Sequence, residues 1–150
     1  MASDGRYWVT PVTAQILQYS NTEVMLYKIV NVLLTLLFAL FAYFQLNDPD
    51  AITWAFLYGF VAIMIGMATF NRFNLAFLIP GISIFTLYFF YLTPSILDWI
   101  VSDDSLVGVE MTDDKPYIER TREAFGLLMG LVVLLFVLFQ QTTRKKKVLQ

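Results

Sequence analysis

Hydrogen-bonding and ionisable side chains gather in one short stretch between two long apolar runs of the chain. The stretch reads Gln45-Leu46-Asn47-Asp48-Pro49-Asp50, and Trp54 and Tyr58 follow it one turn apart. Carboxylates and amides at the edge of a membrane-spanning segment are candidates for binding a lipid headgroup, a proton or a hard divalent cation. The stretch is therefore the first candidate binding site.

A helix cap explains part of this stretch. Asp48 is a favourable N-cap residue, Pro49 would occupy the first helical position, and Asp50 would complement the positive end of the helix dipole. Trp54 and Tyr58, four residues apart, would then face one way as interfacial anchors. The cap leaves Gln45 and Asn47 unexplained, so both interpretations stay open.

Four ionisable residues lie close together at the start of the last apolar segment: Glu119, Arg120, Arg122 and Glu123. Helical spacing places Glu119, Arg122 and Glu123 on one face and Arg120 on another. They can form a solvated first turn whose ion pairs contribute little. Alternatively, one of the arginines pairs with Asp48 or Asp50 at the level of the lipid headgroups, where a bidentate guanidinium contact is favoured.

The chain contains no histidine and no cysteine. This removes the usual ligands of zinc and haem, the usual general base, disulfides and thiolate nucleophiles. We therefore predict no cofactor, no metal site and no catalytic residue. An enzyme that uses Glu119 or Glu123 as acid or base beside Asp50 on a lipid substrate is the least favoured interpretation.

Composition and hydropathy indicate an all-α membrane protein. Of 150 residues, 58% are hydrophobic and 15% charged, against about 45–50% and about 25% in soluble domains; the mean hydropathy is +0.64. We predict one domain, residues 1–150, in which four transmembrane helices form an up-down bundle. The expected helices are about 24–46, 51–70, 75–92 and 117–141, with an acidic loop at 93–116.

Two local features modify this outline. Val12, Ile16 and Tyr19 follow a helical period, which predicts a short N-terminal interfacial helix. Pro80-Gly81 should kink the third helix. The first apolar run is long enough to remain as an anchor, and no secretory signal peptide is evident.

The basic residues predict the orientation. Four spans place both termini and the loop between helices 2 and 3 on one side, which carries seven of the ten basic residues and a net charge of +5; the other side carries −7. The positive-inside rule therefore predicts cytoplasmic termini and an external acidic loop. We expect a multi-pass protein of the bacterial cytoplasmic (inner) membrane.

Small residues predict where helices approach each other closely. Gly126 and Gly130 form a GxxxG pattern in the last helix, and Ala62 and Gly66 are four apart in the second. We expect helices 2 and 4 to pack together, within one chain or across a dimer. This contact would bring the two polar stretches together.

The pattern Gln45-x-Asn47-Asp48-Pro49-Asp50, followed by Trp54 and Tyr58, resembles the signature of the transmembrane protein 220 family. The segment Glu119–Glu123 leading into Phe125-Gly126-Leu127 is similar to that family's last span. These are small multi-pass proteins of bacteria and animals whose function is uncharacterised. The resemblance implies the four-helix fold and the polar residues already named, but no mechanism.

Two functions follow from the sequence. The first is a non-enzymatic accessory or scaffold subunit that packs against a larger membrane complex, with the lipid bilayer and other membrane-protein subunits or a second copy as partners. The alternative is a small binding or transport protein with an external polar pocket for a lipid headgroup or a cation. The basic tail Arg144–Lys147 suits anionic headgroups, and no nucleic-acid role is expected.

Overall fold

The computed structural model describes residues 11–47, 50–72, 74–102, 104–106 and 115–148, with side chains described between residues 22 and 143 of these ranges. This part of the chain forms four α-helices and one short 3₁₀ helix: α1 (Pro11–Phe44), η1 (Gln45–Asn47), α2 (Ala51–Thr69), α3 (Leu75–Ser102) and α4 (Pro116–Val148). Each α-helix contains a segment long and apolar enough to cross a membrane. The predicted all-α, four-span class is confirmed.

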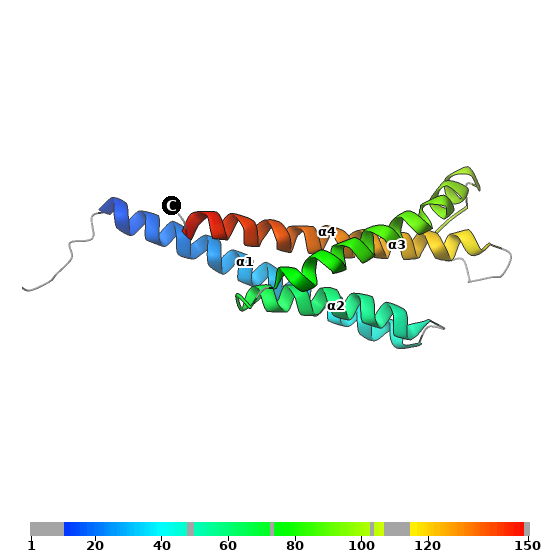
Figure 1. The fold of residues 1–150 in the computed structure, drawn as a ribbon, viewed down its shortest axis with the longest axis horizontal. Helices are drawn as coiled ribbons and strands as arrows, with labels where there is room; N and C mark the ends of the chain where they lie inside the picture. Colours follow the sequence, from blue (N-terminus) through cyan, green and yellow to red (C-terminus); the bar gives the residue numbers. More distant parts are fainter. Residues whose placement is uncertain (1–10, 48–49, 73, 103, 107–114, 149–150) are drawn as a thin grey trace, which may run out of the picture.

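Successive helices run in opposite directions along the long axis (Figure 1). The start of α1, the turn between α2 and α3, and the end of α4 lie at one end, which we call the turn end. The starts of α2 and α4 lie at the opposite end, which we call the site end. The two polar stretches of the sequence therefore belong to the same end of the molecule.

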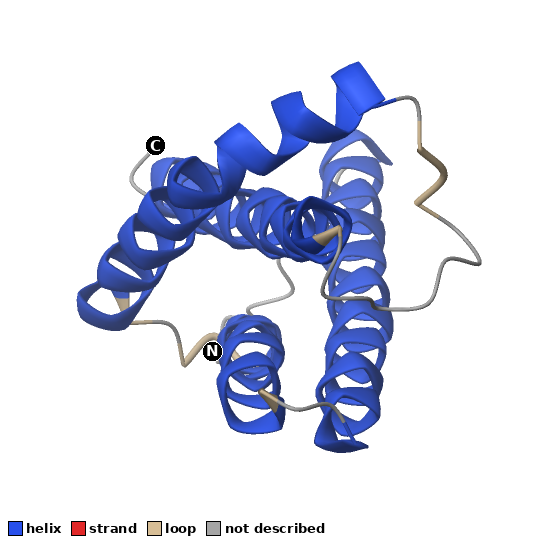
Figure 2. Cartoon of the chain, turned by 90° about the vertical axis from the view of Figure 1, so that its right-hand side faces the viewer, coloured by secondary structure: helices blue, strands red, loops and turns tan. Residues whose placement is uncertain are grey.

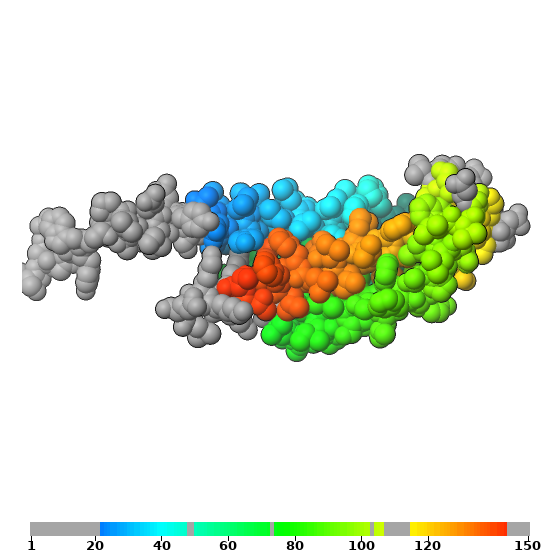
Figure 3. Space-filling view, turned by 90° about the horizontal axis from the view of Figure 1, so that it is seen from above, coloured from blue at the N-terminus to red at the C-terminus, as the bar shows by residue number. Residues whose placement is uncertain are grey.

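The helices pack as two pairs, α1 with α2 and α3 with α4, and the contact between α2 and α4 joins the pairs. On the face shown in Figure 3, α4 lies between α1 and α3. Val61 and Ile65 of α2 and Leu127 and Leu134 of α4 are fully buried where the pairs meet. The outer surfaces of α1 and α3 are rich in exposed leucine and phenylalanine, as expected of surfaces that face lipid.

Three predicted helix boundaries differ from the structure, and one of them is the end of the last helix, because α4 continues to Val148 and not only to residue 141. The sequence predicts that the third helix ends near Leu92, but α3 continues to Ser102, so the predicted loop 93–116 begins ten residues later. Pro94 removes only one backbone hydrogen bond, and buried Thr121 of α4 donates to the Ser95 carbonyl at 2.9 Å, which fixes this part of α3 against α4. Figure 2 shows α3 bending along its length, an expected consequence of internal proline.

The first helix also differs. The predicted interfacial helix is not separate, because α1 is continuous from Pro11 to Phe44. Proline at the first position favours a helix start, and no glycine or proline interrupts residues 12–24. Among the residues whose side chains are described, the candidate membrane span of this helix covers Thr22–Asn47.

Candidate functional site

The start of α2 places Asp50 in a position different from the predicted one. The helix begins at Ala51, so Asp50 occupies the N-cap position and its carbonyl accepts a hydrogen bond from Thr53 N at 3.0 Å. Its side chain makes no capping hydrogen bond. The expectation that Pro49 is the first helical residue is therefore wrong, and Asp48 and Pro49 themselves lie outside the described residues. The exposed Asp50 carboxylate is not used by the cap.

Trp54 and Tyr58 project into the bundle instead of anchoring it at the interface. They are 4% and 8% exposed. The Trp54 ring stacks on Tyr88 of α3, with ring centroids 6.1 Å apart and an interplanar angle of 24°. The Tyr58 ring lies between Trp54 (5.8 Å) and Phe41 of α1 (5.8 Å). Such pairs add to the energy of apolar burial, so these rings connect three helices.

The half-buried Glu123 of α4 lies next to this aromatic group. The Trp54 indole lies close enough to the Glu123 carboxylate to interact with it. Asp50 and Glu119 are close enough to act on Glu123 electrostatically, and Arg120 is the cation that acts on it. The hydroxyls of Tyr58 and Tyr88 lie within electrostatic range as well.

We name this arrangement the acidic–aromatic site. It consists of Asp50, Trp54, Tyr58, Tyr88, Glu119 and Glu123. Three carboxylates and three aromatic rings from α2, α3 and α4 thus converge at the site end of the bundle, in or next to the membrane-spanning segments.

Two glycines of α4 make this approach possible. A Cβ atom at Gly126 would overlap the Tyr58 hydroxyl, and one at Gly130 would meet the Phe85 ring of α3. The aromatic side chains of Tyr58 and Phe85, from the same chain, therefore pack against the two glycines of the GxxxG pattern.

The predicted contact of helices 2 and 4 forms, but Gly66 of α2 does not take part in it as predicted. The expected contact of helices 2 and 4 occurs within one chain. Gly66, however, does not face α4, because a Cβ atom placed on it would lie 3.8 Å from the Thr35 methyl group of α1. This glycine serves the contact between α1 and α2.

Of the remaining predicted site residues, Arg120 lies within electrostatic range of Glu123, while Gln45 and Asn47 lie apart. Gln45 is half-buried and Asn47 exposed, and in the described ranges no hydrogen bond joins either to the acidic–aromatic site. Arg122 turns away, and its Nε donates to the Leu106 carbonyl at 2.8 Å. No ion pair joins Asp50 to Arg120 or Arg122 in the part of the chain that is described. The predicted arginine–aspartate pair is therefore not seen for Asp50 in the described residues, and Asp48 lies outside them.

A family comparison covers this site. The family model described as "Transmembrane family 220, helix" matches residues 37–139. The chain belongs to transmembrane family 220. All six residues of the acidic–aromatic site fall within the matched range of this family. No curated protein and no solved structure matches the chain.

A second polar contact lies at the turn end, and both of its residues are just outside the matched range 37–139. Asn31 of α1 and Gln140 of α4 exchange two hydrogen bonds, both 3.0 Å, and are 0% and 1% exposed. Neither residue is among the predicted site residues. The sequence did contain a signal for this contact, namely one amide side chain in each of two apolar runs. An amide buried in a membrane needs a hydrogen-bond partner, so two such amides can be expected to pair.

The loop between α3 and α4 is held at both ends. Asp104 accepts hydrogen bonds from Lys115 Nζ at 2.7 Å and from the Tyr117 hydroxyl, while the Trp99 indole donates to the Asp104 carbonyl at 2.7 Å. The hydrogen bond from Lys115 is the largest cause that lowers the pKa of the Asp104 carboxyl, and the same contact raises the pKa of Lys115. Both groups lie outside the spans.

Proposed function

We propose that this member of transmembrane family 220 is a non-enzymatic binding protein whose acidic–aromatic site receives an organic cation, namely the ammonium group of a lipid headgroup. One observation supports this proposal above all. Glu123, half-buried among aromatic rings, is faced by two further carboxylates and by one arginine.

The charge balance of the site favours a cation. Asp50 and Glu119 repel the Glu123 carboxylate, and Arg120 offsets only part of this repulsion, since one cation acts on Glu123 against two carboxylates. The Arg122 Nε is directed to the loop carbonyl of Leu106. Repulsion between carboxylates is stronger near a bilayer than in water, because the effective dielectric constant is lower. A bound cation would relieve this repulsion.

The aromatic rings favour an organic cation over a metal ion. Of the three rings, Trp54 and Tyr58 are buried and Tyr88 is partly exposed. An aromatic ring face attracts an ammonium group by about 0.5–2 kcal/mol. No group of three carboxylates in the described residues is close enough to hold a metal ion. Trp54 lies four positions into α2, or about 6 Å along its axis, so an ammonium group there would be at headgroup depth.

The test uses the purified full-length chain in mild detergent. We expect added phosphatidylethanolamine to raise the melting temperature more than diacylglycerol does, because diacylglycerol has no ammonium group. Glu123→Gln, which keeps an acceptor for the Trp54 indole, should remove this preference, because it removes the central charge. Asp98→Asn is the matched control, since Asp98 is an exposed carboxylate of α3 outside the site.

Two results would count against the proposal. One is an equal response of the wild type to both lipids. The other is an unchanged preference in Glu123→Gln and in Glu119→Gln, which serves as a second variant if the first folds poorly.

The accessory-subunit role is a second candidate, favoured by the surface of α1. Of the most apolar 18 residues of the α1 span, only 11% are buried within the chain. Leu36 and Leu40, four positions apart and both exposed, form one ridge that another membrane protein or a second copy could cover. A stoichiometric partner that is lost in the Leu36→Ala/Leu40→Ala variant would support this role; a monomer in native purification would oppose it.

The compartment and orientation are also proposals. We propose cytoplasmic termini in a bacterial cytoplasmic membrane, supported by the seven basic residues on the turn-end side of the sequence. A reporter fused to either terminus should be active in the cytoplasm, and external activity of both fusions would reject this orientation.

A further inference from the structure

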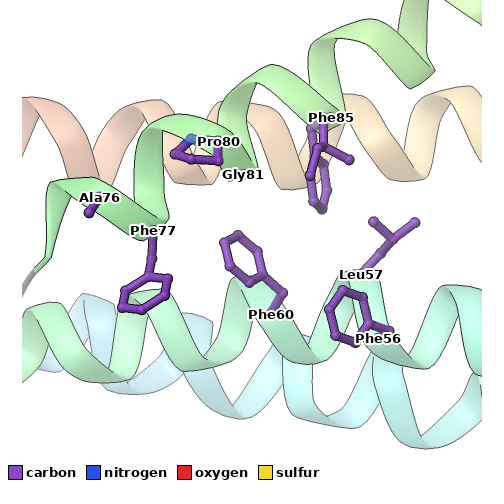
Figure 4. A pocket seen from close by; sticks show the side chains of 9 residues that line it. Phe56, Leu57, Phe60, Ala76, Phe77, Pro80, Gly81 and Phe85 are labelled. Carbon is purple, nitrogen blue, oxygen red and sulfur yellow. The ribbon is translucent and has the colours of Figure 1, made fainter.

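An apolar groove of about 200 Å³ lies between α2 and α3. Phe56 and Phe60 project into it from α2, and Ala76, Phe77, Pro80 and Phe85 line it from α3 (Figure 4). We infer that this groove holds one acyl chain of an anionic phospholipid from the leaflet at the turn end.

The groove exists because α3 packs on α4 and not along its neighbour in sequence, α2. The Phe60 ring reaches across to Gly81, where a Cβ atom would overlap it. One turn beyond Leu57 and Phe85, towards the site end, the stacked rings of Trp54 and Tyr88 connect the two helices. The groove is therefore limited at that end and extends towards the α2–α3 turn.

The dimensions suit a lipid chain and not a helix. From Ala76 to Phe85 the helix rises about 14 Å, close to half of the roughly 30 Å hydrocarbon core. A helix of that length and of about 10 Å diameter would fill roughly 1,000 Å³, far more than the groove offers. One acyl chain of one leaflet matches the length of the groove and is much thinner than a helix.

The residues at the open end of the groove, next to the α2–α3 turn, indicate the charge of the lipid headgroup. The groove is lined by apolar side chains, so a polar headgroup must remain outside it. Arg72 is exposed in the α2–α3 turn, four positions before Ala76, and its guanidinium can bind a phosphate. An anionic phospholipid such as phosphatidylglycerol complements this charge. The Trp54–Tyr88 pair forms the edge of the acidic–aromatic site and lies between the groove and the carboxylates of that site. This inference therefore does not depend on the proposed function.

The test places the full-length chain in phosphatidylcholine vesicles that contain phosphatidylglycerol with a diazirine in its acyl chain. After irradiation, labelled peptides should come mainly from residues 56–60 and 76–85. Ala76→Phe fills the groove from its exposed edge and should lower this labelling about threefold or more; the effect is modest because packing alone, and not the hydrophobic effect, favours the groove over bulk lipid. Ala39→Phe is the matched control, an exposed alanine on α1.

Further variants make the result decisive. Ile84→Phe replaces Ala76→Phe if the latter does not fold. Arg72→Gln should reduce labelling by phosphatidylglycerol to the level of a diazirine-bearing phosphatidylcholine, and Glu123→Gln should leave it unchanged.

Three outcomes would overturn the inference: equal labelling of the groove and the outer face of α1, equal labelling by both lipids in the wild type, or cross-links to a second copy or another protein at residues 76–85.

Discussion

The Asn31–Gln140 pair makes the sharpest prediction about stability. Its two hydrogen bonds, both 3.0 Å, are the polar link between α1 and α4 within the described spans, and both side chains are buried. Asn31→Leu and Gln140→Met remove one partner each with little change in volume. Each single variant leaves the other amide buried without its partner.

The expected magnitudes follow from this geometry. A buried polar group left unsatisfied costs about 1–3 kcal/mol, so each single variant should lose about that much free energy of unfolding. An interhelical hydrogen bond in a membrane contributes about 0.6 kcal/mol on average, and two such bonds give a coupling of about 1 kcal/mol or more. The double variant should therefore lose clearly less than the sum of the single losses.

The assay is a double-mutant cycle, with the free energy of unfolding measured by detergent titration in mixed micelles. Gln141→Met is the matched control. Gln141 is adjacent and 8% exposed, but its Nε2 is buried without a partner in the described structure. Replacing it should be neutral or stabilising.

Two results would refute the reasoning. Additive losses in the cycle would show that the amides do not stabilise each other. A loss in Gln141→Met as large as that in Gln140→Met would show that burial alone, and not the reciprocal pair, determines the cost.

Two further predictions concern the site and the loop. Gly126→Ala should destabilise the fold by about 1–3 kcal/mol through overpacking, and Tyr58→Phe should rescue it, because the Tyr58 hydroxyl is the atom that the new Cβ meets; a failure of rescue in thermal unfolding would contradict this contact. The lowered pKa of the Asp104 carboxyl means that its contact with Lys115 stabilises the loop above the unfolded carboxyl pKa and is lost as pH falls through the folded one. The wild type should therefore exceed Asp104→Asn in melting temperature at neutral pH and approach it on acidification, and a constant difference would exclude this linkage.

Much of the fold was predictable because the position and the length of each apolar run are given directly by the order of residues in the sequence. The four spans, the short connection before α3 and the alternation of helix direction follow from apolar runs of the right length. Because directions alternate, Asp50 and Glu123 had to lie at the same end. The interactions of Glu123 with Asp50 and Trp54 show that the two polar stretches also meet there.

The rotation of each helix about its axis was not predictable. In a soluble bundle a polar face marks the outside, but here apolar residues cover all sides of the spans, so periodicity does not distinguish the inner face. For this reason the sequence favours Trp54 as a surface anchor and directs Gly66 towards α4, and it gives no link between Asn31 and Gln140.

The sequence by itself determined the class, the spans and the family resemblance, because these depend on the local order of residues. It also determined the end of the bundle at which the polar stretches lie, because successive spans alternate in direction. The tertiary structure decided which of those residues meet. It placed Glu123 among Trp54, Asp50 and Glu119, directed Arg122 to the loop, and left a groove between α2 and α3. Such contacts depend on helix rotation, close approach at glycine and the path of α3 through two prolines, which only packing in three dimensions fixes.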